Sequence, residues 1–195
     1  SNDSYENSYI AVIGMAGRFP GSKNLAQYWE NLCQGKELIT HFSKAELIAA
    51  GISQNLLGNP RYVKSRGILD DVECFDADFF FFSPFEASIM DPQHRIFLEI
   101  CWEALEAAGY VPGKFSGLMS VFAGMSNSGY LENFLLRNEK IKNNNNNYQT
   151  EIATSENFLA TKISYYLNLK GPSLNINTAC STSLVAIIKA CQSLL

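Results

Sequence analysis

The residue of this chain with the strongest physical reason to be reactive is Cys180. It follows a predicted strand with alternate apolar residues, Leu174 to Thr178, and stands just before an apolar run typical of a helix. The first backbone N–H groups of a helix are unpaired and the helix dipole is positive there, so this position favours a thiolate. The neighbours Ala179, Ser181 and Ser183 are small and leave room for a substrate. The position predicts a nucleophile whose own backbone N–H helps to hold an oxyanion on an attacked thioester.

A buried structural role for Cys180 is the alternative, because free cysteine is among the most buried residue types. The four other cysteines are expected to be structural: Cys33, Cys74, Cys101 and Cys191. The cysteine count is odd and no C-x-x-C or zinc-like spacing occurs, so neither a disulfide framework nor a zinc site is predicted.

A cysteine nucleophile usually works with a histidine base, and the chain has only His41 and His94. His94 falls in the first turn of a predicted helix, where the dipole disfavours its protonated form. His41 lies in a polar stretch without a signature. A thiol acyltransferase that pairs Cys180 with His94 stays open, and it requires the two side chains within hydrogen-bond reach.

The composition limits the possible classes of protein. The 195 residues are 47% hydrophobic and 17% charged, which suits one packed domain and not a disordered chain. The net charge of −4 gives no electrostatic footprint for nucleic acid, and no apolar run is long enough to span a membrane. Residues 1–8 are a polar N-terminal segment or a tag remnant without the features of an export signal, so reduced thiols in the cytoplasm are expected.

Strands and helices alternate along the chain, which predicts an α/β fold. Strands are expected at residues 9–15, 117–124 and 174–178. Helices are expected at residues 24–34, 92–108, 130–138 and 155–167. Five consecutive asparagines, within residues 142–148, indicate an exposed mobile loop inside the domain.

Local signals fix several element ends. Ser43 with Glu46 and Ser83 with Glu86 are capping boxes, and Asp91 caps the longest helix, which Gly109 ends. The apolar stripe of that helix is expected to contain Ile96, Phe97, Ile100, Cys101, Ala104, Leu105 and Ala108. The segment GMAGRFPGS has two glycines three apart after a strand, but Pro20 prevents the helix that a phosphate-binding loop needs, so a tight turn is the better interpretation.

Three long segments resemble the β-ketoacyl synthase (ketosynthase) domains of modular type I polyketide synthases. They are IAVIGMAGRFPGSKNLAQYWENLCQGKELIT, FDADFFFFSPFEASIMDPQHRIFLEICWEALEAAGY and LATKISYYLNLKGPSLNINTACSTSLVA. The second segment matches the family's D-P-Q-x-R-x-x-L-E motif, and the segment NTACSTSLVAIIKACQSLL resembles the family's nucleophile segment. The resemblance covers residues 9–195 in the family's order.

The resemblance implies the N-terminal half of a thiolase-like fold, layered α-β-α-β-α, that dimerises through the strand before the nucleophile. It implies that Cys180 accepts an acyl chain from a carrier-protein thioester for decarboxylative Claisen condensation with a malonyl-type extender. No metal or cofactor would be bound directly, because the acyl carrier protein supplies the phosphopantetheine. Other implied partners are the rest of the ketosynthase and the neighbouring synthase domains.

The chain departs from the family's pattern after Cys180. The family's catalytic histidines and a supporting lysine follow the nucleophile, whereas this sequence stops fifteen residues after it. His41 and His94 stand where the family has no catalytic histidine. We therefore expect part of a condensing enzyme that is not competent by itself. The alternative is a non-catalytic scaffold or dimerisation fragment of the same fold.

Overall fold

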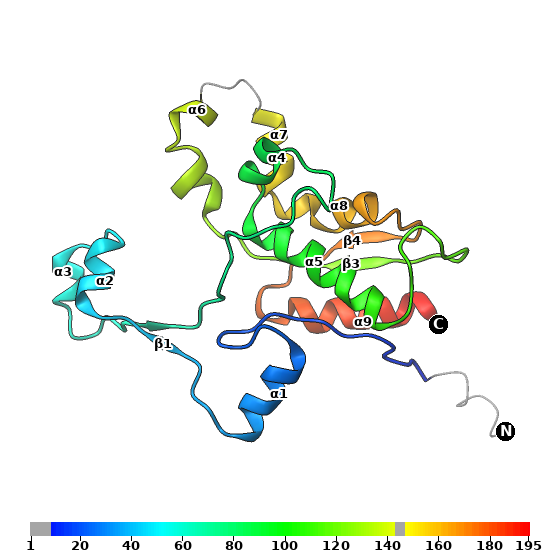
Figure 1. Cartoon of the computed structure of the whole chain (residues 1–195), viewed down its shortest axis with the longest axis horizontal. Coiled ribbons are helices and arrows are strands. Elements are labelled where there is room, and N and C mark those ends of the chain that lie inside the picture. Colours follow the sequence, from blue (N-terminus) through cyan, green and yellow to red (C-terminus); the bar gives the residue numbers. More distant parts are fainter. Residues whose placement is uncertain (1–8, 143–146) are drawn as a thin grey trace. The chain divides into compact units, whose positions relative to one another are not determined.

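A computed structural model of the chain describes residues 9–142 and 147–195 (Figure 1). These residues belong to two compact units. The larger unit contains Val72–Leu195 with the N-terminal segment up to Ala16, and the smaller unit contains Gly17–Asp71. Cys180 lies in the larger unit.

Two short parallel strands lie at the centre of the larger unit. In β3 (Val121–Ala123) and β4 (Ser173–Asn175), Val121 pairs with Ser173 and Ala123 with Asn175. Two helices, α8 (Leu159–Tyr166) and α9 (Thr182–Leu194), contact the strands and lie on opposite sides of them in Figure 1. Helices on both sides of a parallel sheet are the α/β arrangement that the sequence predicted.

The longest helix, α5 (Pro92–Ala107), begins and ends as predicted. The Asp91 side chain accepts a hydrogen bond from the Gln93 backbone N–H, and Gly109 follows the helix with a φ of 75°. Its buried residues are His94, Arg95 and Leu98, whereas the predicted stripe is only partly buried. Much of the stripe, including Phe97, Cys101 and Leu105, lines an apolar pocket, whereas the Arg95 guanidinium points to the backbone carbonyls of residues 72 and 73.

Aromatic side chains fill the core beside α5. Along the run of four phenylalanines, Phe80 and Phe82 are buried, whereas Phe81 is 92% exposed. The Phe82 ring packs on Tyr166 of α8 with ring centroids 4.2 Å apart. Phe81 also has a φ of 61°, a left-handed conformation that bulky residues rarely adopt.

The other elements of the larger unit surround this core. They are α4 (Pro84–Ile89), the π-helix η2 (Leu131–Leu135), α6 (Glu139–Lys142), α7 (Asn147–Thr154) and the 3₁₀ turns η3 (Glu156–Phe158) and η4 (Ala179–Ser181). The capping box of Ser83 and Glu86 is present at α4. The helix expected at 130–138 is a single π-helical segment.

The Asn-rich loop predicted at 142–148 falls mainly on residues 143–146, outside the described residues. On its two sides, α6 includes residue 142 and α7 includes residue 147.

The strand predicted at residues 9–15 is not formed in this structure. The segment has no regular structure, and Val12, Ile13 and Met15 are 76%, 62% and 65% exposed. The residue types suit a strand, but a strand also needs a hydrogen-bonding neighbour, and within the described residues none lies beside this segment.

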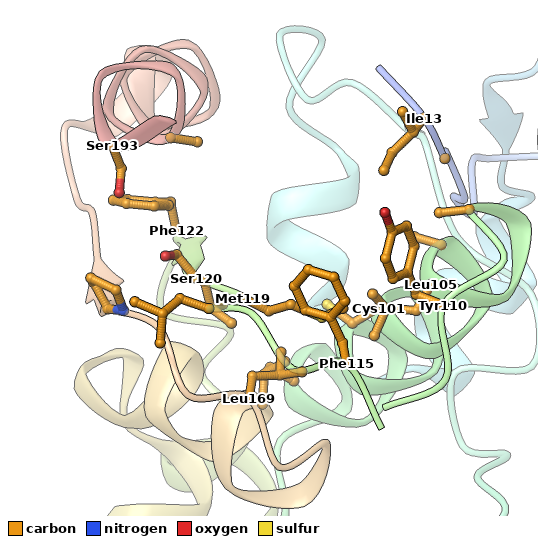
Figure 2. Close-up of a pocket in the computed structure, with 18 of the residues that line it drawn as sticks. Ile13, Cys101, Leu105, Tyr110, Phe115, Met119, Ser120, Phe122, Leu169 and Ser193 are labelled. Atoms are coloured by element: carbon orange, nitrogen blue, oxygen red, sulfur yellow. The ribbon is translucent and has the colours of Figure 1, made fainter. Parts of the chain in front are cut away.

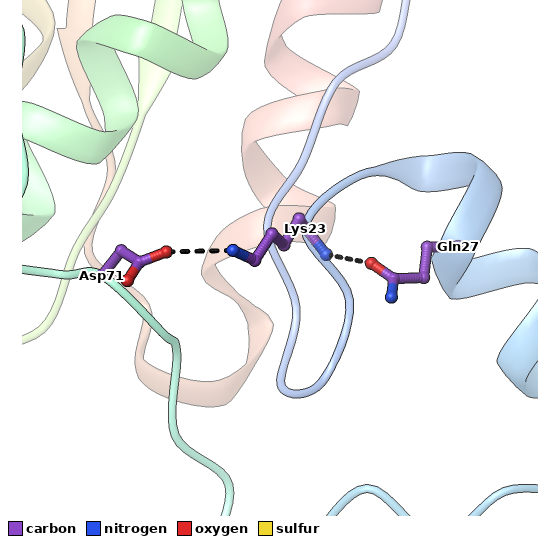
Figure 3. A network of polar contacts seen from close by, with 3 residues as sticks. All are labelled: Lys23, Gln27 and Asp71. Atoms are coloured by element: carbon purple, nitrogen blue, oxygen red, sulfur yellow. Dashed lines mark hydrogen bonds and ion pairs between the residues drawn. The ribbon is translucent and has the colours of Figure 1, made fainter.

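The smaller unit contains α1 (Leu25–Cys33), α2 (Lys44–Ala49) and α3 (Gln54–Leu57). It also has the two-residue antiparallel strands β1 (Thr40–His41) and β2 (Ser65–Arg66). Its ends are joined at the surface, where Lys23 Nζ lies 3.2 Å from Asp71 Oδ2 and the Lys23 N–H donates to Gln27 (Figure 3). Such an exposed ion pair contributes only about 0–1 kcal/mol.

The predicted helix at 24–34 is confirmed as α1, and the capping box of Ser43 and Glu46 is present at α2. Two of the large apolar side chains of α1, Trp29 and Leu32, are 68% and 51% exposed. The tight turn is also present: Phe19 and Ser22 exchange two backbone hydrogen bonds around Gly21, whose φ is 65°.

No helix in the described ranges has both the length and the apolar character needed to cross a bilayer.

Candidate functional site

Cys180 lies in the turn η4, which joins β4 to α9 (Figure 1). Its side chain is exposed, unlike that of a buried structural cysteine. The preceding residue, Ala179, has a φ of 54°, which costs an L-residue about 1–2 kcal/mol. A strained residue beside an exposed thiol at a helix start is typical of a functional turn.

Hydroxyl groups hold this turn in its conformation. The Ser181 hydroxyl donates to the Thr178 carbonyl at 2.8 Å. The Thr182 hydroxyl accepts from the Thr178 N–H at 3.0 Å and donates to the Ala179 carbonyl at 2.8 Å. The small polar residues around Cys180 therefore do more than leave space, because they fix the backbone that carries the thiol.

Two asparagines connect the turn to the start of α8. Asn175 accepts from the Ala160 N–H at 2.8 Å and donates to the Asn157 carbonyl. Asn177 donates to Glu156 Oε1 at 3.0 Å. These bonds were not predicted from the sequence, although two asparagines at alternate positions before Cys180 were a visible signal.

Gly124, which follows β3, lets two backbones approach closely at this site. A Cβ atom there would collide with the carbonyl oxygen of Ile176 and the methyl group of Thr182. The absence of a side chain at position 124 therefore allows the chain from Ile176 to Thr182 to pack against the end of β3.

His94 does not contact Cys180. It is completely buried, and its Nδ1 lies 2.9 Å from Lys162 Nζ. Because an ammonium group can only donate, Nδ1 is the acceptor and the ring is neutral with its proton on Nε2. Nε2 has no hydrogen-bond partner of normal geometry within the described residues. The hydrogen bond required for a Cys180–His94 pair is therefore missing, and that option is excluded.

The half-buried lysine in this cluster, Lys162, was not singled out from the sequence. Lys162 Nζ also donates to the Ile152 carbonyl at 3.0 Å, and burial lowers the Lys162 pKa to about 8 while Asp91 acts to raise it. The Asp91 carboxylate accepts from Ser128 Oγ and from the Gln93 N–H. The cluster joins α5, α7 and α8 and has a structural role.

The remaining candidates are separate from Cys180. His41 Nδ1 lies 2.7 Å from Ser65 Oγ in the smaller unit. Cys33 and Cys74 are exposed, Cys101 and Cys191 are half-buried, and burial raises the Cys101 pKa to about 12. Among the described residues, no three acidic, histidine or cysteine side chains converge as metal ligands.

Figure 2 shows an apolar pocket of about 790 Å³ that Cys180 does not line. Cys101 and Leu105 of α5, Phe122 of β3 and Ser193 of α9 form parts of its wall, and Ile13 lies at its edge. A smaller pocket of about 290 Å³ includes Glu156 and Asn157 in its lining, the residues that bond Asn177 and Asn175.

Comparison with known proteins matches this chain to one family. Residues 7–195 match the family model described as "Beta-ketoacyl synthase, N-terminal domain". A phenolphthiocerol/phthiocerol polyketide synthase of Mycobacterium tuberculosis is 46% identical over 192 residues, which are 95% of this chain and 13% of that protein. The polyketide synthase PksM of Bacillus subtilis is 38% identical over 197 residues, 95% of this chain and 4% of that protein.

Solved ketosynthase structures superpose on most of the chain. Ketosynthase twelve of the bacillaene polyketide synthase of Bacillus amyloliquefaciens has a TM-score of 0.84 at 34% identity, over 97% of this chain and 33% of that one. The module 1 ketosynthase of the same organism has a TM-score of 0.79 at 38% identity, over 94% of this chain and 32% of that one. The fold is thus thiolase-like, and the chain spans about a third of these solved domains.

Proposed function

Because the chain belongs to the β-ketoacyl synthase family, where it matches the N-terminal domain, we propose that it is the nucleophile-bearing part of a polyketide ketosynthase. The observation that carries the proposal is the exposed Cys180 thiol on its strained turn at the head of α9. A thiol in this position has access to a substrate and lies in the field of a helix N-terminus.

In the proposed reaction the Cys180 thiolate attacks the carbonyl carbon of an acyl thioester on a carrier protein. The backbone N–H of Cys180 stabilises the oxyanion that forms. The tetrahedral intermediate then expels the pantetheine thiolate of the carrier protein, which takes up a proton. The acyl chain is left as a thioester on Cys180, and the phosphopantetheine remains with the carrier protein.

Condensation would follow in the complete domain. A malonyl-type extender loses CO₂, its carbanion attacks the acyl-cysteine, and the Cys180 thiolate leaves. Among the described residues, no histidine lies beside Cys180. We therefore assign only the self-acylation step to this chain. The residues that promote decarboxylation of the extender are assigned to the part of the domain outside this chain. The acyltransferase reaction is therefore that of the whole ketosynthase, in the cytoplasm and next to other synthase domains.

We also propose a homodimer formed through β4. One edge of β4 pairs with β3, and among the described residues no strand pairs with its other edge. Leu174 in this strand is 48% exposed. An exposed strand edge is a template for pairing with a second chain, which supports this mode of association.

Mass spectrometry after incubation with an acyl thioester tests the central assignment. We expect one acyl adduct, mapped to Cys180 and absent from Cys180→Ala. Cys74→Ala is the matched control, because it removes another exposed thiol of the same unit and should leave the adduct in place. An adduct that survives Cys180→Ala would reject the assignment.

A non-catalytic scaffold is the second candidate function. It is supported by the apolar side chains that this chain exposes, such as Leu184 and Ile187 of α9, which are 60% and 59% exposed. Surfaces of this kind often mark interfaces. A soluble chain that melts cooperatively and forms no acyl adduct would favour the scaffold, whereas the Cys180 adduct described above would favour the enzyme.

A further inference from the structure

Thr182 is the first residue of α9 and holds the turn of Cys180 with both branches of its side chain. Its hydroxyl accepts a hydrogen bond from the Thr178 N–H at 3.0 Å and donates one to the Ala179 carbonyl at 2.8 Å. Its methyl group lies so close to Gly124 that a Cβ atom there would collide with it. Because a β-branched side chain has few allowed rotamers, the methyl contact aims the hydroxyl at these two backbone groups.

The carbonyl that Thr182 bonds belongs to the same peptide group as the N–H of Cys180. A peptide group is planar and trans, so the C=O of Ala179 and the N–H of Cys180 point in opposite directions. The backbone N–H of Thr182 also donates to the Ala179 carbonyl. One end of the peptide group is therefore held by two hydrogen bonds, and the orientation of the Cys180 N–H at the other end is fixed with it.

The Cys180 N–H is free to bind a substrate oxygen. Among the described residues no hydrogen bond uses it, whereas the next N–H, that of Ser181, donates to the Thr178 carbonyl at 3.3 Å. Hydrogen bonds in a chain polarise one another, so a bond to the C=O of a peptide group makes its N–H a stronger donor. The hydroxyl of Thr182 therefore both orients this donor and strengthens it.

We infer that Thr182 is a positioning residue for acyl transfer, and that its hydroxyl directs the Cys180 N–H at the oxyanion formed on an attacked acyl thioester. This inference rests on the function proposed above. Thr182 acts through the peptide group of Ala179 and Cys180, not by contact with the substrate. Loss of the hydroxyl should therefore slow reactions that place a negative charge on an oxygen of the substrate.

A purely structural role for Thr182 leads to a different expectation. If the hydroxyl only held the turn together, its loss would change the reactivity of the Cys180 thiol toward every electrophile alike. Attack on an acyl thioester forms a tetrahedral oxyanion, whereas alkylation by iodoacetamide displaces iodide from a saturated carbon and forms none. The ratio of the acylation rate to the alkylation rate at Cys180 therefore separates the two roles.

The test compares Thr182→Val with the parent chain. The reagents are an acyl-N-acetylcysteamine thioester and iodoacetamide, and mass spectrometry of the Cys180 peptide measures both rates. Valine keeps the branched shape of threonine and has no hydroxyl. We expect acylation to slow about fivefold, the effect of one hydrogen bond, while alkylation changes by less than about twofold. Thr182→Ser keeps the hydroxyl and should retain the parent ratio.

Two other hydroxyl groups of the same unit provide matched controls. The hydroxyl of Thr161 in α8 donates to the carbonyl three positions back, as that of Thr182 does. The Ser181 hydroxyl belongs to the nucleophile turn but donates to the Thr178 carbonyl, which is in a different peptide group from the Cys180 N–H. Thr161→Val and Ser181→Ala should therefore leave the ratio at Cys180 near the parent value.

The outcomes separate this inference from the proposed function. No acylation of the parent chain would reject the proposed function. If the parent is acylated, an unchanged ratio in Thr182→Val would overturn the inference while the proposed function stands. A ratio lowered as much by Ser181→Ala, or lowered by Thr182→Ser, would overturn it too.

Unfolded chain is detected in the same samples through Cys101. This half-buried thiol of α5 should react with iodoacetamide only when the chain opens, so its alkylation measures the unfolded fraction. If Thr182→Val unfolds, the pair Thr182→Ser and Thr182→Ala decides the matter, because these two small side chains differ only in the hydroxyl. Equal ratios in this pair would overturn the inference, whereas a higher ratio for serine supports it.

Discussion

Lys162 Nζ lies 2.9 Å from Nδ1 of the fully buried His94, so the lysine ammonium group holds this imidazole in its neutral form. Burial, together with the positive charge of Lys162, lowers the His94 pKa to about 3, and a contact with the Ser155 backbone acts in the opposite direction. An unfolded histidine titrates near ~6.5.

Acid should therefore destabilise the protein through His94. Between about pH 6.5 and about pH 3 the unfolded chain binds a proton that the folded chain does not, so stability falls as the pH falls. His94→Gln keeps an acceptor for Lys162 and does not titrate. In this variant the unfolding free energy should therefore fall less steeply with falling pH, by the slope that corresponds to the uptake of up to one proton. Urea unfolding of the parent and of the variant across this pH range measures the two slopes. Equal slopes for His94→Gln and the parent would contradict this prediction.

Alkaline conditions should instead increase the stability of the folded protein through Lys162. Its pKa is lowered to about 8 by burial, whereas an unfolded lysine titrates near ~10.4. Between these values the unfolded chain binds more protons, so this group makes the protein more stable as the pH rises from about 8. Lys162→Met should remove the rise, which urea unfolding between pH 7.5 and ~10 detects. The prediction fails if the variant keeps the parent's slope.

Cys101 should be the slowest thiol to react in the folded protein. Burial raises its pKa to about 12, so at pH 8 only about one molecule in ten thousand carries the thiolate. We expect the exposed Cys33, Cys74 and Cys180 to be alkylated by iodoacetamide while Cys101 stays free until denaturant is added. Peptide mass spectrometry at successive times measures the order, and early alkylation of Cys101 would show that its side of α5 opens.

Much of the site was predictable because its signals are local. The strand-to-helix junction at Cys180, the capping boxes at Ser43 and Ser83 and the end of α5 at Gly109 depend on neighbouring residues, and all are present. The left-handed conformation of Ala179 was not predictable, because alanine does not favour it. The Thr182 hydroxyl bonds the Ala179 carbonyl, and Gly124, distant in the sequence, packs closely against Ile176 and Thr182 of the same segment.

Predictions that depended on distant partners were less accurate. The residue types at 9–15 are those of a strand, yet the strand is absent. A strand forms only beside a hydrogen-bonded partner strand, and the residues of one segment do not specify that partner. The burial of Lys162 against His94 joins positions 68 apart in the chain, and no spacing rule reports such a contact. The exposure of Trp29 likewise depends on what lies against α1, not on the helical pattern.

Phe81 should be a position where glycine stabilises the protein. Its φ of 61° costs an L-residue about 1–2 kcal/mol, and its side chain is 92% exposed and gains little by packing. Phe81→Gly should be more stable than Phe81→Ala by about 1 kcal/mol, because both remove the ring but only glycine relieves the backbone. Urea unfolding of the pair measures the difference, and equal stabilities would contradict the strained conformation.

Gly124→Ala should disturb the nucleophile turn itself. The added Cβ would collide with the Ile176 carbonyl and the Thr182 methyl group, so we expect a loss of about 2 kcal/mol and a displaced turn. The rate of Cys180 alkylation, relative to that of Cys74, reports the displacement separately from stability. Gly58→Ala is the matched control, since its Cβ would meet atoms no closer than 3.5 Å and should change stability by less than about 0.5 kcal/mol. A Gly124→Ala protein with unchanged stability and an unchanged Cys180 rate would mean that the end of β3 does not hold the turn in place.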